Sequence, residues 1–189
     1  MAILRGPGAG GAGGAAVLHD TFTQTNGTLL NSYGKWSTTG TGTMDVQGNV
    51  ARLVTSTNNS LRMTSTGAAV TNMLHVQGTV SKVSTGGATN NINISIAGVG
   101  TFSVSCINRN AGSNITQTFT FFAALADDGF WYVQLQACPD MVGSTGTIGF
   151  ITRSQGVNSS SPTGEFYIEL DQNNAGDTTT MTLDNVVYG

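Results

Sequence analysis

The feature that most constrains this fold is a two-residue alternation of apolar and polar side chains. Near the C-terminus, Phe166, Ile168 and Leu170 alternate with polar residues. Successive side chains of a strand point to opposite faces of its sheet, so such a segment buries one face and exposes the other. The same pattern recurs in residues 91–96, 101–106, 115–121 and 180–183. With turn-forming Gly, Asn and Asp between these segments, it predicts an all-β fold, an antiparallel two-sheet β-sandwich of the jelly-roll type.

The small number of charged residues excludes some classes of binding partner. Charged residues make up 9% of the chain, and the formal net charge is −3. The seven Lys and Arg residues are scattered along the sequence, which argues against nucleic acid as the main ligand. No apolar run approaches the ~18–20 residues that span a bilayer, so we expect no membrane partner. Arg5 is followed by Gly residues instead of the apolar segment of a secretory signal, and we expect synthesis in a cytoplasm.

The first sixteen residues, MAILRGPGAGGAGGAA, contain six Gly and five Ala. Ordering such a segment costs roughly 1–2 kcal/mol per residue, and it has few side chains to bury in return. We therefore divide the chain into an N-terminal arm, residues 1–16, and a sandwich domain, residues 17–189. We expect another surface, most simply a neighbouring subunit, to hold the arm. The contact residues expected in it are Ile3, Leu4, Arg5, Gly6, Pro7 and Gly8.

Three aromatic side chains, Trp131, Tyr132 and Tyr167, are candidate surface contacts. Trp131 and Tyr132 are adjacent in one expected strand, so one of them should face outward. Exposed rings can stack on sugars or bind another subunit, and both interpretations stay open.

The sequence indicates a protein that is not an enzyme. Glu165 and Glu169 lie on one face of an expected strand, about 13 Å apart from strand rise. That separation is too large for the paired carboxylates of a glycosidase, so we interpret them as a solvated stripe. Cys106 and Cys138 are most simply two buried thiols, with a disulfide as the alternative.

Two motifs carry a resemblance to known folds. The opening motif combines Asp20-x-Phe22, Gly27-Thr28-x-Leu30 and Trp36, and the closing motif is MTLDNVVY, residues 181–188. Both resemble the terminal strands of concanavalin-like and carbohydrate-module-like jelly rolls. The resemblance implies the sandwich fold over residues 20–188 and a buried Trp36, and it says little about function because that fold serves many functions.

In many modules of this kind, acidic groups beside the paired terminal strands hold a structural calcium. The matching residues here are Asp20 and Asp184, with Asp45 as a further carboxylate. Calcium takes six to eight oxygen ligands, and this set supplies few of them. We therefore expect no cofactor and interpret both aspartates as turn or strand-end residues.

The combination of a Gly-rich arm, a low-charge sandwich and no catalytic motif resembles a decoration (cement) protein of tailed-bacteriophage capsids. The resemblance implies a virion structural protein on the outer capsid surface. Its partners would be the major capsid protein or other virion subunits, and it would form a homo-oligomer, with a trimer favoured at a three-fold site. The alternative is a carbohydrate-binding or host-adhesin module, with a glycan as partner, or a tail-fibre component.

Overall fold

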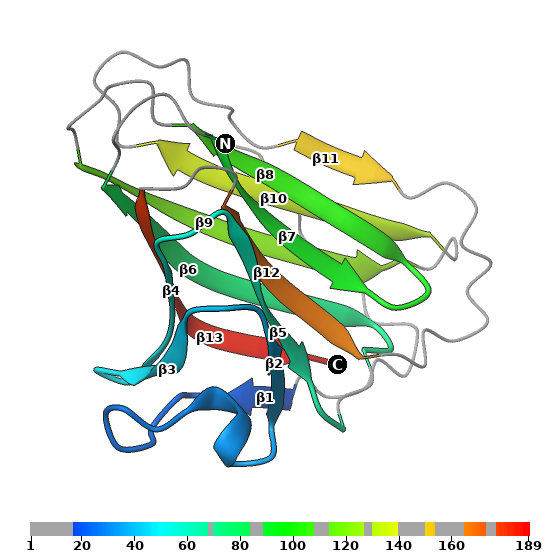
Figure 1. The fold of residues 1–189 in the computed structure, drawn as a ribbon. Helices are drawn as coiled ribbons and strands as arrows, with labels where there is room; N and C mark the ends of the chain where they lie inside the picture. Colours follow the sequence, from blue (N-terminus) through cyan, green and yellow to red (C-terminus); the bar gives the residue numbers. More distant parts are fainter. Residues whose placement is uncertain are drawn as a thin grey trace.

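The computed structural model in Figure 1 is an all-β sandwich of two antiparallel sheets, which confirms the predicted jelly-roll class. It describes residues 17–67, 70–83, 89–107, 114–126, 130–139, 150–153, 165–172 and 177–189. The arm, with its expected contacts Ile3, Leu4, Arg5, Gly6, Pro7 and Gly8, lies outside these residues, and so do the side chains of Cys106 and Cys138. Among the described residues, no helix has the length and apolar character needed to cross a membrane.

The large sheet contains eight strands. Seven of them follow the order β11 (Phe150–Arg153), β10 (Trp131–Pro139), β9 (Asn114–Leu125), β6 (Met73–Val83), β13 (Thr178–Tyr188), β4 (Val50–Thr55) and β3 (Thr43–Gln47). The eighth, β1 (Val17–Asp20), pairs with the end of β13, so the first and last described strands lie side by side.

The small sheet contains five strands and packs across the large one (Figure 1). Its order is β2 (Trp36–Thr39), β5 (Asn59–Ser65), β12 (Phe166–Gln172), β7 (Thr89–Ile96) and β8 (Gly100–Ile107). A single turn of 3-10 helix, η1 (Leu30–Ser32), precedes β2.

The core lies between the two sheets and consists of the apolar half of each alternating strand. Its largest fully buried side chains include Phe22, Trp36, Phe119, Phe121, Trp131 and Phe166. Trp36 is buried, as the resemblance implies. Trp131 has no exposed surface, because it faces inward while Tyr132 faces outward. Trp131 is therefore not a surface contact, which corrects that prediction.

The Asp20 carboxylate joins the end of β1 to the core. Its Oδ1 accepts a hydrogen bond from the backbone N–H of Phe22 at 2.8 Å. Its Oδ2 accepts hydrogen bonds from Trp36 Nε1 at 2.8 Å and from the Tyr33 hydroxyl at 3.0 Å. Phe22 has a positive φ of 51°, a conformation that is strained for a bulky residue and that the Asp20 bond holds in place. The Phe22 ring can then stack on Trp36, with 6.2 Å between the centroids.

The two aspartates that the resemblance assigns to calcium have different environments. Asp20 is buried and accepts hydrogen bonds from the protein's own donors. Asp184 is exposed, and it is the extra residue of a bulge in β13 between Leu183 and Asn185. Among the described residues, no group of three or more His, Cys, Asp or Glu side chains could hold a metal ion.

His19 lies in an aromatic cluster beside Asp20 and its hydrogen-bond partners. Its ring makes edge contacts with Trp36, Phe166 and Tyr188, at centroid distances of 4.7, 5.6 and 5.5 Å. Burial lowers the pKa of His19 below its ordinary value, although a hydrogen bond with the Lys35 carbonyl and the nearby Asp20 charge oppose the shift. The neutral imidazole is thus the form that fits the folded protein.

Asp20→Asn should destabilise the protein. The neutral amide is a weaker acceptor, and its NH2 group would face N–H or O–H donors, so we expect a loss of about 2–3 kcal/mol in the free energy of unfolding. Asp184→Asn is the matched control and should leave stability within about 0.5 kcal/mol, because Asp184 is exposed. Urea unfolding with EDTA and with added calcium measures both variants. A calcium-dependent stabilisation of the wild type that either variant abolishes would contradict this structural role.

Stability should fall on mild acidification. Burial lowers the folded-state pKa of both His19 and His75, so the unfolded chain, with histidine pKa near 6.5, binds more protons than the folded chain. The histidine contribution is complete above about pH 6.5 and is lost as the pH falls from there through the lowered folded-state pKa values. Urea midpoints between about pH 7.5 and 5 should show this slope. His19→Gln and His75→Gln should each reduce it, and an unchanged slope in the double variant would refute the assignment.

Candidate functional site

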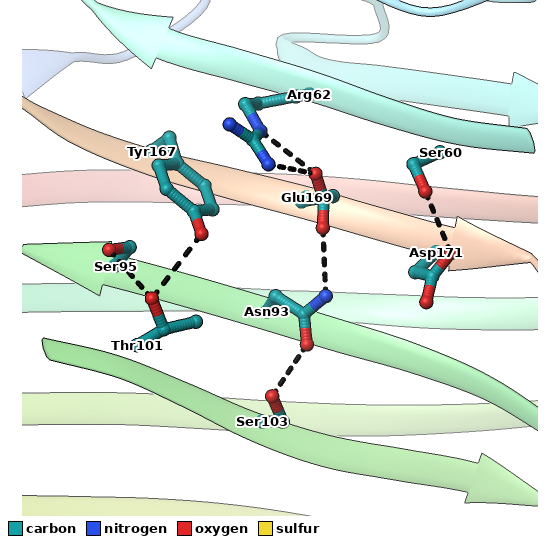
Figure 2. A network of polar contacts seen from close by, with 9 residues as sticks. All are labelled: Ser60, Arg62, Asn93, Ser95, Thr101, Ser103, Tyr167, Glu169 and Asp171. Atoms are coloured by element: carbon teal, nitrogen blue, oxygen red, sulfur yellow. Dashed lines mark hydrogen bonds and ion pairs between the residues drawn. The ribbon is translucent and has the colours of Figure 1, made fainter.

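The outer face of the small sheet carries a continuous set of polar side chains (Figure 2). In β12, Phe166, Ile168 and Leu170 are buried in the core. Alternation therefore turns Tyr167 and Glu169 to the outer face. The neighbouring strands follow the same rule, so this surface is the polar half of the pattern read from the sequence.

The strand register aligns four of these side chains. Glu169 of β12 lies opposite Arg62 of β5 on one side and Asn93 of β7 on the other. Asn93 in turn lies opposite Ser103 of β8. We call Arg62, Glu169, Asn93 and Ser103 the central row. The row crosses four adjacent strands, and cross-strand neighbours are close enough for their side chains to make direct contact.

Hydrogen bonds connect the central row from end to end. Arg62 donates to Glu169 Oε2 through Nε at 2.8 Å and through Nη2 at 2.7 Å. Asn93 Nδ2 donates to Glu169 Oε1 at 2.8 Å. Ser103 Oγ donates to Asn93 Oδ1 at 2.6 Å. Each member fixes the orientation of the next, so the row presents its polar atoms in a defined geometry.

Glu169 is the buried centre of the row. Its side chain is 10% exposed, whereas that of Arg62 is 40% exposed. The carboxylate thus holds the guanidinium in place, and the guanidinium is the group that meets solvent. This corrects the interpretation of Glu165 and Glu169 as one solvated stripe. Glu165 is exposed just before β12, and Glu169 is enclosed by its hydrogen-bond partners.

Tyr167 forms a second row beside the first. The Arg62 guanidinium carbon lies 3.9 Å from the centre of the Tyr167 ring, a cation–π contact. The Tyr167 hydroxyl lies 3.3 Å from Thr101 Oγ1, and Thr101 donates to Ser95 Oγ at 3.0 Å. The ring and the guanidinium are therefore held together as one partly exposed platform.

Asp171 completes the face on the other side of Glu169. Ser60 Oγ donates to Asp171 Oδ1 at 2.7 Å (Figure 2). The residues in Figure 2 thus combine one guanidinium and two carboxylates with hydroxyl and amide groups. Such a surface both donates and accepts hydrogen bonds and has little net charge.

The three aromatic candidates lie in three different environments. Trp131 is in the core and Tyr167 is on the outer face of the small sheet. Tyr132 is 36% exposed on the outer face of the large sheet, where Phe122 is also exposed. The two surface tyrosines therefore lie on opposite sides of the sandwich and cannot contribute to one site.

Sequence reasoning missed Arg62, Asn93 and Ser103. One signal was available, because Arg62 is the only charged residue in the segment NSLRMTS that forms β5. A charge at the centre of a strand in a chain with so few charges indicates a partner across the sheet. The identity of that partner depends on strand order, which alternation does not encode.

Comparisons with known proteins give structural neighbours only. No family model matches the chain, and no curated protein matches it. Among solved structures, the carbohydrate recognition domain of Emp47p has a TM-score of 0.46 at 13% identity, covering 92% of this chain and 93% of that domain. A family 29 carbohydrate-binding module has a TM-score of 0.40 at 10% identity, covering 92% of this chain and 88% of that module. At these identities the likeness concerns the fold alone.

Glu169→Gln should weaken the central row. The substitution removes the charge that holds Arg62 and turns an amide NH2 toward one of two donors, Arg62 or Asn93. We expect the free energy of unfolding to fall by about 1–2 kcal/mol, because the pair is partly screened by solvent. Glu165→Gln removes the same charge from an exposed position and is the matched control. Equal urea midpoints for the two variants would contradict the role of Glu169.

Proposed function

We propose that this protein is a binding module for carbohydrate and that the ligand lies on the outer face of the small sheet. The observation that carries the proposal is the platform of Arg62 and Tyr167, held in place by the central row. A sugar needs an apolar or π surface for its ring face and fixed polar atoms for its hydroxyl groups. This face offers the Arg62 guanidinium stacked on the Tyr167 ring, with fixed polar atoms of Asn93 and Ser103 in neighbouring strands.

The geometry favours binding because few side chains would have to become ordered when a ligand binds. Glu169 fixes Arg62, and the Thr101 contact fixes the Tyr167 hydroxyl. Side chains that are already ordered lose less conformational entropy when a ligand arrives. Tyr and Arg are also, with Trp, the residue types enriched among the energetic hot spots of protein–protein interfaces.

The low charge of the face supports a hydroxyl-rich ligand over a highly charged one. Glu169 neutralises Arg62 at 2.7 Å, which leaves Asp171 as the remaining charge among the residues in Figure 2. A strongly anionic ligand would be repelled by this carboxylate, and a cationic ligand would find only this one further carboxylate among the residues in Figure 2. The Ser, Thr and Asn side chains of the face provide the other polar groups that could contact the ligand.

A role as a capsid decoration protein stays a prediction from the sequence. It depends on the arm, residues 1–16, which lies outside the described residues. The predicted location on a virion and the predicted capsid partners depend on the same segment. Glycan binding and attachment to a virion do not exclude each other, because the arm and the small sheet are separate parts of the chain.

Glycan-array screening followed by calorimetry on the best ligand tests the proposal. Tyr167→Ala and Arg62→Ala should each weaken binding about tenfold or more, because each removes half of the platform. The chain provides matched controls on the large sheet. Tyr132 is an exposed tyrosine, and Arg52 pairs with Asp45 at 2.8 Å much as Arg62 pairs with Glu169.

Tyr132→Ala and Arg52→Ala should leave glycan affinity unchanged. Thermal unfolding of all four variants separates a loss of binding from a loss of folding. If no glycan binds, or if the large-sheet variants weaken binding as much as the small-sheet variants, this assignment of the face is wrong.

A further inference from the structure

The two edges of the small sheet differ in length. One edge is β2, which has four residues. The other is β8, which has eight residues, Gly100–Ile107, and pairs with β7 in an unbroken register. In the part of the chain that the structure describes, β8 has a neighbouring strand on one side only (Figure 1). Its other side therefore carries a row of backbone N–H and C=O groups directed away from the sheet.

The sequence of β8, GTFSVSCI, contains none of the features that usually protect a sheet edge. Exposed edges are commonly blunted by charged side chains, Pro, bulges or a very short strand. β8 has no charged residue and no Pro, and its pairing with β7 contains no register shift. At the described edges of the large sheet, β11 has four residues, and β3 has five and is bridged from Leu29 to Asp45. Within the described ranges, β8 is thus the longest of these edges, and it has neither the short length of β11 nor a bridge like that of β3.

We infer that β8 pairs antiparallel with β8 of a second copy of this chain, about a two-fold axis. A second copy fits this edge, because it brings an identical and equally uncharged strand. In an antiparallel pair about such an axis, the donors of one strand meet the acceptors of an identical strand. The absence of charge in β8 means that two copies approach without like-charge repulsion. The two small sheets then form one continuous sheet.

This pairing would join the two binding faces. Thr101 and Ser103 are exposed on the outer face of β8, at the proposed junction. Ser103 ends the central row, so the rows of two copies would approach each other across the axis. A long polysaccharide could then contact two equivalent platforms and gain avidity. This consequence rests on the proposed function, whereas the pairing itself does not.

Sedimentation equilibrium of the full-length chain over a range of concentrations tests the pairing. We expect the wild type to reach twice the chain mass. Ser103→Lys should reduce the mass to that of a single chain, because two lysines would meet near the axis. Ser37→Lys is the matched control on the opposite edge. Ser37 is an exposed serine on the same outer face, and its variant should remain a dimer.

Amide hydrogen exchange of the wild type gives a second readout that needs no variant. Protection of residues 101–106 should rise with protein concentration, while that of β2 should not change. A single-chain mass at all concentrations, a trimer, or the same mass for both lysine variants when circular dichroism shows them folded would overturn the pairing. If the pairing fails while Tyr167→Ala still weakens glycan binding, only the dimer is wrong and the proposed function stands.

Discussion

The burial of one face of each alternating strand, where the structure describes its side chains, is the constraint on which the rest of this structure depends. The apolar half of each alternating segment lies between the two sheets, in a core that includes Trp36, Trp131 and Phe166. The polar half must then lie outside. In a chain with so few charges, that outer half consists mainly of hydroxyl and amide groups. The same pattern that produces the core therefore also produces a polar surface of low charge.

Two carboxylates organise different parts of this sandwich. Asp20 is buried beside the aromatic cluster and orients Phe22, Tyr33 and Trp36 through its hydrogen bonds. Glu169 is on the outer face of the small sheet, enclosed by its hydrogen-bond partners, and orients Arg62 and Asn93. In both places a carboxylate accepts several N–H or O–H donors, which is how a buried anion avoids a large desolvation cost. The first stabilises the fold, and the second shapes the candidate site.

The fold class could be predicted, and the candidate site could be predicted only in part. Alternation located five strands, β7, β8, β9, β12 and β13, and the opening motif implied that Trp36 is buried, as the structure confirms. Tyr167 was among the candidate surface residues, but nothing in its local sequence identified Arg62 as its neighbour. Glu169 was interpreted as solvated, because an alternating pattern shows which face a residue occupies and not what covers it there. Trp131 shows the same limit, since adjacent aromatic residues do not reveal which one faces inward.

The sequence by itself determined the strand segments, their two faces and the low charge of the exposed half, because these properties depend on residues close together in the chain. Tertiary structure alone decided which strands are neighbours. Arg62 and Glu169 are 107 residues apart in sequence and meet only because β5 pairs with β12. In the part of the chain that the structure describes, β8 is the last strand of the small sheet, next to β7 and beyond β12. Strand order follows from the packing of the whole core, so no local pattern could specify the platform or the open edge.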